Sequence, residues 1–189
     1  IVVPRSYITI DGYTGDWSGI NPVIEDVGGD TTCGAGTDIK SVYLANDNDY
    51  LYWRMDTWSG TYALENDQAP TLIFYQYSGQ HNVIYAVSAQ ADSITTNENG
   101  QWNSVALGQE YGIAGHVYEG KIPLYLIEGH EFNTLLSHYY SGTPNVLCDE
   151  IQLDNIALII DAHGNNLFED VSKKVRERRN IAYKMAGVD

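Results

Sequence analysis

Basic residues are scarce in this sequence. Among its 189 residues, 10 are Lys or Arg and 25 are Asp or Glu, which gives a formal net charge of −15 at pH 7. Proteins that bind nucleic acid neutralise phosphates with a basic surface, and most of this chain lacks one. The composition therefore argues against a nucleic-acid partner. Acidic loops favour a hard cation such as Ca²⁺ instead.

Long apolar runs are missing as well. No stretch approaches the roughly 20 apolar residues that a helix needs to cross a bilayer, so we expect no membrane span. The chain begins at Ile1 rather than at Met, which is consistent with a mature or excised fragment that has lost a targeting segment. The 15 Tyr and 18 Gly suit a β protein. We therefore expect a secreted protein, extracellular or periplasmic.

Cysteine is used only twice, as Cys33 in a Gly-rich loop and as Cys148 just before an expected strand. In an oxidising compartment the two residues would be able to pair. Spacing alone does not fix connectivity, so a disulfide and two free thiols both stay open. A chain of this length most simply makes one domain, with a core that does not need a crosslink as its sole support.

Motifs of common catalysts are also missing. The sequence contains no Gly-x-Ser-x-Gly elbow, no phosphate-binding glycine loop and no paired-cysteine metal site. His130 and His138 lie eight residues apart, not the four of a zinc-binding helix. Acidic pairs such as Asp149-Glu150 resemble glycosidase carboxylates, but 25 acidic residues produce such pairs by chance. We therefore expect that the protein is not an enzyme, and a small glycan-active hydrolase stays as an alternative.

A strong β-hairpin signal is present between Asp38 and Trp58. Residues 39–45 and 50–56 are rich in β-branched, aromatic and aliphatic side chains, and the Asn-Asp-Asn-Asp segment between them tolerates the backbone angles of a tight turn. Every second residue from Leu51 to Met55 is large and apolar, the pattern of a strand with one buried face. The sequence therefore predicts a hairpin with Trp53 in the core.

Other short strands are expected along the chain, separated by turn residues. Residues 128–137 are predicted to form one or two helical turns, and 59–70 and 93–100 to form polar loops. Many short strands spaced by turns predict an antiparallel β-sandwich with jelly-roll or immunoglobulin-like layers. The expected strands outside the hairpin are 7–10, 71–77, 81–90, 101–106, 111–117, 118–127 and 151–161.

The end of the chain differs in kind. Residues 167–186 contain no Gly or Pro, and Val171, Val175 and Met185 fall on one helical stripe. Six of the ten basic residues lie within the last 19 positions. We predict a sandwich domain at 1–166 followed by a basic amphipathic helix at 167–189. This helix would fold back on the acidic body or contact a protein partner.

Three segments, in this order and spacing, carry a family resemblance. They are ITIDGYTGDWSGINPVIED at 8–26, DIKSVYLANDNDYLYWRMD at 38–56 and YEGKIPLYLI at 118–127, and DNIALIIDAHGNN at 154–166 adds a fourth. Together they resemble the β-sandwich superfamily of family-nine carbohydrate-binding modules and DOMON-like domains. The resemblance implies a sugar-binding sandwich. The two tryptophans that clamp sugar in family-nine modules have no counterpart here, so that clamp is not carried over.

Aromatic side chains in or beside loops are the candidates for glycan contact. The apolar C–H face of a pyranose ring stacks on a π surface, while nearby Asp, Asn and Gln bond the hydroxyls. The competing interpretation is that Trp17 and Trp53 are core residues and that the others are merely partly exposed. The predicted ligand-binding residues are Trp58, Trp102, Tyr62 and Tyr75.

Carboxylates gather in the Gly-rich loop 25–38 and in the hairpin turn. Calcium takes six to eight oxygen ligands, which such loops supply. A structural Ca²⁺ is expected if the loop folds over the hairpin, although Asx residues also serve turn geometry and no EF-hand spacing occurs. A calcium-stabilised adhesion module that binds a protein partner is therefore the second functional hypothesis. The predicted metal ligands are Asp26, Asp30, Asp38, Asp47 and Asp49.

Overall fold

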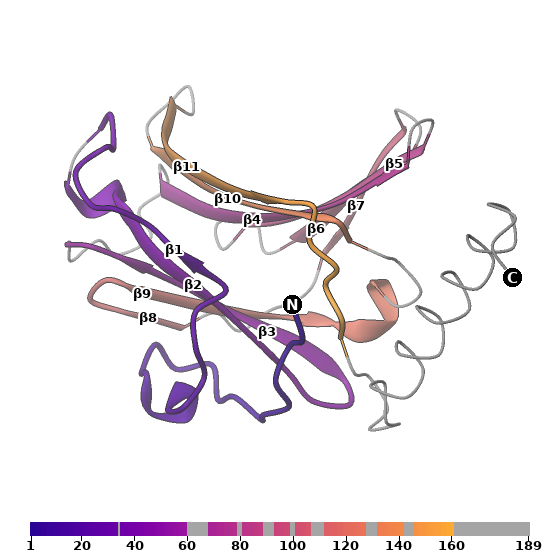
Figure 1. The fold of residues 1–189 in the computed structure, drawn as a ribbon, viewed down its shortest axis with the longest axis horizontal. Helices are drawn as coiled ribbons and strands as arrows, with labels where there is room; N and C mark the ends of the chain where they lie inside the picture. The colour runs from indigo at the N-terminus through magenta and orange to yellow at the C-terminus, as the bar shows by residue number, and fades with distance from the viewer. Residues whose placement is uncertain are drawn as a thin grey trace, which may run out of the picture.

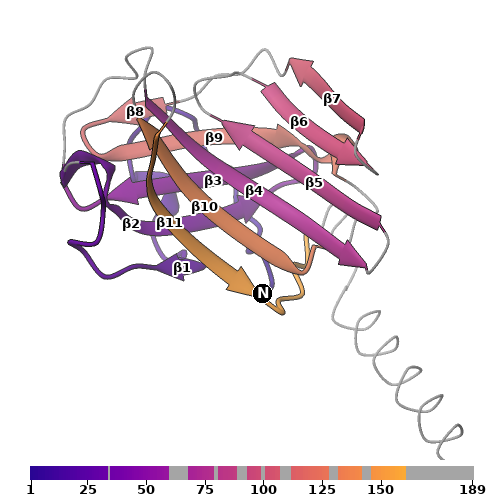
Figure 2. The same ribbon diagram turned by 90° about the horizontal axis from the view of Figure 1, so that it is seen from above.

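A computed structural model of the chain describes most of its first 160 residues. The described ranges are 1–33, 35–59, 68–78, 81–88, 93–98, 101–106, 112–127, 132–141 and 146–160. The predicted helix at 167–189 lies outside them. Two antiparallel sheets face each other in Figures 1 and 2, which confirms the predicted β-sandwich.

The first sheet has the strand order β1-β2-β3-β9-β8 and contains the predicted hairpin. Strands β2 and β3 pair as expected, with Leu44 opposite Trp53. Short 3-10 helices, η1 (Gly15–Trp17), η2 (Ala35–Thr37) and η3 (Leu124–Leu126), flank these strands. The strands are β1 (Ile24–Glu25), β2 (Ile39–Asn46), β3 (Tyr50–Thr57), β8 (Gly112–Ala114) and β9 (Val117–Pro123).

The second sheet has the order β11-β10-β4-β5-β6-β7. Its outer strand β11 runs along β10 with one irregularity, between Tyr139 and Tyr140 of β10. The strands are β4 (Gln68–Ser78), β5 (His81–Ser88), β6 (Ser93–Glu98), β7 (Gln101–Ala106), β10 (Thr134–Ser141) and β11 (Val146–Asp154). No helix among the described residues is long and apolar enough to cross a membrane.

The core lies between the two sheets. Trp53 is fully buried and packs in one cluster with Phe74 of β4 and Leu135 of β10. Burying such large side chains stabilises the fold by about 1.5–3 kcal/mol each. The prediction that Trp53 belongs to the core is therefore confirmed. Gly120 on the neighbouring strand β9 permits this packing, since a β-carbon there would lie 2.7 Å from the indole.

Strand β3 is buried on both faces, whereas its alternation predicted one buried face. Tyr52 is buried on the side away from the core, in a second cluster with Ile8 and Trp17. The N-terminal segment therefore covers the outer face of the first sheet. A buried carboxylate holds it there: Glu119 accepts hydrogen bonds from the indole Nε1 of Trp17 at 2.7 Å and from the amide of Gly12 at 2.9 Å.

Several local predictions were wrong. Residues 134–137, the end of the segment predicted as helical turns, lie in strand β10, because this strand pairs with a neighbour on each side and places Leu135 and Tyr139 in the core. Residues 93–98 form β6, although their polar composition indicated a loop. The last strand ends at Asp154, because Asn155 adopts a left-handed backbone with φ +56°.

Candidate functional site at the rim of the sandwich

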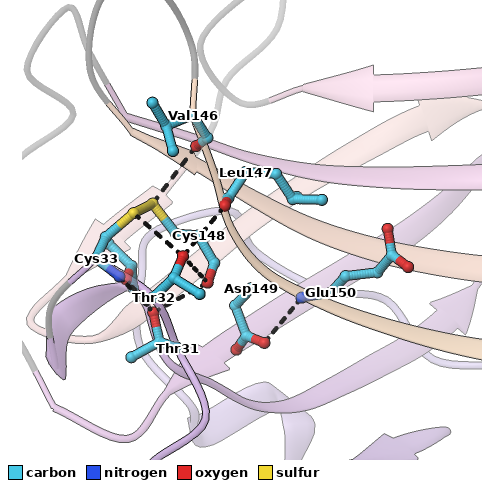
Figure 3. The surroundings of a disulfide bond; sticks show 9 residues. Thr31, Thr32, Cys33, Val146, Leu147, Cys148, Asp149 and Glu150 are labelled. Carbon is cyan, nitrogen blue, oxygen red and sulfur yellow. Dashed lines mark hydrogen bonds between the residues drawn. A yellow bond between two sulfur atoms is a disulfide. The ribbon is translucent and has the colours of Figure 1, made fainter.

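A disulfide joins the two sheets at one rim of the sandwich. Cys33 pairs with Cys148, so the interpretation with paired cysteines is confirmed. The bond links the Gly-rich loop before β2 to strand β11. Figure 3 shows Thr31 and Thr32 beside this bond, and the Thr32 amide donates to the carbonyl oxygen of Cys148 at 2.8 Å. Covalent and hydrogen bonds therefore hold the loop against β11.

Four aspartates, here named the rim cluster, lie next to the disulfide, and all but the exposed Asp30 are buried or partly buried. They are Asp26, Asp30, Asp38 and Asp149. Asp26, Asp30 and Asp149 each place a carboxylate oxygen within 4.8 Å of the other two. Asp26 follows β1 and Asp149 lies in β11, so the cluster spans the junction of the two sheets.

The oxygens of the rim cluster differ in their partners. The carboxylate of Asp149, 7% exposed, accepts from the amides of Ile39 at 2.6 Å and Glu150 at 2.8 Å. Asp38, 5% exposed, accepts from the Gly29 amide at 2.7 Å through Oδ2. Its Oδ1 and the Oδ2 of Asp26 are buried without a hydrogen-bond partner. Such orphaned oxygens are costly in a folded protein.

The charges of the cluster are also uncompensated. Within the part of the chain that the structure describes, no Lys or Arg forms an ion pair with any of the four carboxylates. Burial raises the pKa of Asp26, and the charges of Asp30 and Asp38 raise it further. Burial likewise raises the pKa of Asp149, with Asp30 and Asp26 adding to the effect. Mutual repulsion therefore opposes ionisation of the cluster.

This donor set fits a calcium ion. Ca²⁺ binds oxygen at about 2.3–2.6 Å, so oxygens on opposite sides of one ion lie about 5 Å apart. The three carboxylates of the cluster fall within that span. A divalent cation would offset the repulsion among these three carboxylates.

The structure does not bring all five predicted metal ligands together. Asp26, Asp30 and Asp38 lie at the start of β2, whereas Asp47 and Asp49 follow its end. Eight residues of strand extend about 26 Å, so one ion cannot reach both groups. The Gly-rich loop folds toward β11 instead of over the hairpin turn, because the disulfide and Thr32 tie it there.

Asp149 is the ligand candidate that sequence reasoning missed. In the sequence it is only one member of an adjacent acidic pair, Asp149-Glu150. Its position directly after Cys148 was the available signal, because a disulfide to Cys33 brings it to the loop that carries Asp30. That signal depended on a cysteine pairing that the spacing left open.

Trp58 is the one predicted ligand residue whose side chain the structure describes. Its indole is 48% exposed, directly after strand β3. Its amide donates to the carbonyl oxygen of Asp38 at 2.9 Å. A β-carbon at Gly28 would lie 3.0 Å from the indole ring, and Nζ of Lys40 lies 5.1 Å from its centroid. Trp58 is therefore an exposed aromatic side chain held beside the rim cluster.

Two of the other predicted ligand residues, Trp102 and Tyr75, lie on strands away from this site. Trp102 lies in β7 and pairs with Asn97, and Tyr75 lies in β4 between Thr134 and Ile84. Both belong to the second sheet, and Figure 2 shows β7 on the opposite side of the molecule from the end of β3. Tyr62 lies outside the described residues.

Comparison with known proteins finds similarity in structure but not in sequence family. No protein-family model and no curated protein matches the sequence. A carbohydrate-binding module of family 9 from Caldicellulosiruptor kristjanssonii, solved in complex with cellotriose, is similar in structure with a TM-score of 0.43. The two sequences are 16% identical, and the match covers 87% of this chain and 86% of the other.

Proposed function

We propose that the protein is a non-catalytic, secreted module that binds glycan at the rim around Trp58. The half-exposed indole of Trp58 carries the proposal, because a large aromatic surface left in water beside fixed polar groups is a typical sugar platform. The sequence resemblance to family-nine carbohydrate-binding modules supports the same function. The disulfide is consistent with an oxidising, extracellular compartment.

The neighbours of Trp58 suit a polyhydroxylated ligand. Gly28 lies against the indole and Lys40 lies over the ring. Asp30 is exposed at the same rim and would accept hydrogen bonds from sugar hydroxyls. Stacking on the indole requires the Lys40 side chain to swing aside, and its exposed position permits this. The ammonium group would then donate to a ring or hydroxyl oxygen.

Affinity electrophoresis tests this proposal. Native gels containing hydroxyethylcellulose, xylan or mixed-linkage β-glucan should retard the wild type on at least one polysaccharide, and Trp58→Ala should remove most of the retardation. Tyr125→Ala is the matched control, since Tyr125 is an exposed aromatic residue away from the rim cluster. Equal retardation of wild type and Trp58→Ala would reject Trp58 as the platform.

A second role, calcium-dependent stabilisation of an adhesion module, is favoured by the rim cluster. The three convergent carboxylates and the unpartnered Oδ2 of Asp26 support a Ca²⁺ site there. Isothermal titration of Ca²⁺ into chelator-treated protein should show one binding event in the wild type and none in Asp149→Asn. Binding that persists in Asp149→Asn would reject this site. Isothermal titration of candidate extracellular domains into the Ca²⁺-loaded protein would identify the protein partner of such a module.

A further inference from the structure

The Gly-rich loop is shared between the two proposed sites. Asp26 and Asp30 belong to the rim cluster, and Gly28, midway between them, lies against the indole of Trp58. The next residue, Gly29, donates its amide to Asp38 at 2.7 Å, and the carbonyl oxygen of Asp38 accepts from the Trp58 amide at 2.9 Å. One short segment therefore contacts both the carboxylates and the aromatic platform.

The loop depends on the cluster for its position. Asp26 and Asp30 each place a carboxylate oxygen within 4.8 Å of a carboxylate oxygen of Asp149 in β11, an arrangement that like charges oppose. Asp38 is nine-tenths buried, has an oxygen without a hydrogen-bond partner, and acts on Asp26 through its charge. Without a cation, repulsion between the carboxylates opposes this approach of the loop to β11, whereas the Cys33–Cys148 bond and the hydrogen bonds of Thr31 and Thr32 to β11 favour it.

We infer that a divalent cation held by Asp26, Asp30 and Asp149 fixes the loop under Trp58, so that glycan binding at Trp58 depends on that cation. The inference rests on the proposed glycan-binding function. The cation does not need to touch the sugar. It fixes Gly28 against one side of the indole and keeps the Asp38–Trp58 contact in place, which prepares the platform before the ligand arrives.

Thermodynamic linkage gives this coupling a measurable form. If the cation tightens glycan binding by some factor, the glycan must tighten cation binding by the same factor. Couplings of this kind commonly amount to roughly 5- to 150-fold in affinity. We expect glycan affinity to fall by a factor in that range when the cation is removed with chelator, and to recover when Ca²⁺ is added back.

Gly28 is the positioning residue that transmits the effect. Gly28→Ala should displace the indole, because the added carbon would lie 3.0 Å from three of its ring atoms. We expect this variant to lose at least fivefold in glycan affinity while its affinity for Ca²⁺ stays within twofold of wild type. Gly15→Ala is the matched control, since a β-carbon there meets no atom within 4 Å.

The decisive experiment follows Trp58 without any glycan. Ca²⁺ is titrated into chelator-treated protein while tryptophan emission and acrylamide quenching are recorded, in wild type and in Trp58→Phe. The difference between the two proteins reports on Trp58 alone. We expect this difference to change with the same midpoint as calorimetric Ca²⁺ binding, and to stay constant in Asp149→Asn. Asp49→Asn, which removes an exposed carboxylate at the far end of β2, should behave as wild type.

The same samples are then run on polysaccharide gels with chelator and with Ca²⁺. Retardation that requires Ca²⁺, together with the Trp58 signal, supports the inference. Equal retardation in both gels overturns the coupling and leaves glycan binding intact. Ca²⁺ binding that leaves the Trp58 signal unchanged, or no Ca²⁺ binding at all, also overturns it. A Trp58 response to Ca²⁺ without retardation on any polysaccharide supports the link between ion and loop and rejects the glycan-binding function.

Discussion

The two ends of strand β2 differ in the hydrogen-bond donors that surround their carboxylates. At the end, Asp47 accepts from the amides of Asp49 and Tyr50, both at 2.8 Å, and from the Tyr52 hydroxyl at 2.6 Å. At the start, Asp38 keeps one buried oxygen without a partner, and the carboxylates nearby face each other. The carboxylate in the hairpin turn is stabilised by the protein's own donors, whereas two buried oxygens of the rim cluster have no donor among the described residues.

The pKa values of the two regions follow the same division. Burial opposes ionisation of Asp47, but the Tyr52 hydroxyl, the two amides and the charge of Arg5 together lower its pKa. Burial raises the pKa of Asp26 and of Asp149, and neighbouring carboxylates raise both further. An aspartate in a turn is therefore no indication of a metal site by itself. A shortage of donors around convergent oxygens is the distinguishing feature.

The largest effect is expected from removing the disulfide, which ties only the rim end. The bond spans 115 residues, and loss of a native disulfide typically costs about 2–5 kcal/mol in the free energy of unfolding. The double variant Cys33→Ser, Cys148→Ser should lose stability within that range in urea denaturation. Wild type treated with reductant should match it. A variant as stable as the oxidised wild type would mean that the loop is held by its other contacts alone.

The second-largest effect on stability is expected from adding Ca²⁺. It should distinguish the two ends of strand β2, because only the rim cluster is proposed to bind the ion. A ligand that binds only the folded state stabilises it by about 2.7 kcal/mol at a free concentration 100 times its Kd. We expect thermal unfolding of chelator-treated wild type to shift upward on adding Ca²⁺, and the shift to vanish in Asp30→Asn. Asp47→Asn should keep the full shift. A shift lost in Asp47→Asn instead would place the ion at the hairpin turn.

Truncating Asp47, whose carboxylate accepts three hydrogen bonds, should lower the free energy of unfolding by less than the two changes above. Asp47→Ala leaves the Tyr52 hydroxyl and two amides without their acceptor, and an unsatisfied buried donor costs about 1–3 kcal/mol. Urea denaturation should show this loss with or without Ca²⁺. Asp49→Ala is the control, because Asp49 contributes only its backbone to the contacts of the described residues. A loss that depends on Ca²⁺ would contradict the proposed division between the two ends.

The fold was largely predictable because its strongest signals are local. The hairpin is set by two alternating runs around an Asx-rich turn, and β2 and β3 end within one residue of their predicted bounds. Strand β10 was not predictable in this way, because its identity comes from pairing with β4 and β11, far away in the sequence. The second buried face of β3 was not predictable for the same reason, because the N-terminal segment that covers it lies more than 30 residues earlier.

The site was predictable only in part, for a related reason. Trp58 and three of the rim aspartates lie in one stretch of the sequence, so local sequence features were enough to name them as candidates. Asp149 comes from the other sheet, and only the Cys33–Cys148 pairing brings it there. The predicted inclusion of Asp47 assumed that neighbouring acidic turns converge. A strand between two turns separates them by its full length.

The smallest effect is the pH dependence that Asp47 contributes. Its folded-state pKa lies below the ordinary value of 3.8, so between the two values the unfolded chain binds more protons than the folded one. The free energy of unfolding therefore rises with pH in that window, and the contribution of Asp47 is complete above it and lost as the pH falls through the folded-state pKa.

We expect the stability difference between wild type and Asp47→Asn to be constant from pH 7 to about pH 5 and to shrink below about pH 4. Taking the difference cancels the titration of the rim cluster, whose carboxylates have shifts of the opposite sign. A difference that stays flat down to pH 2 would show that the donors around Asp47 bind the neutral acid as well as the carboxylate, and the contrast between the two ends of β2 would then lie in geometry and not in charge.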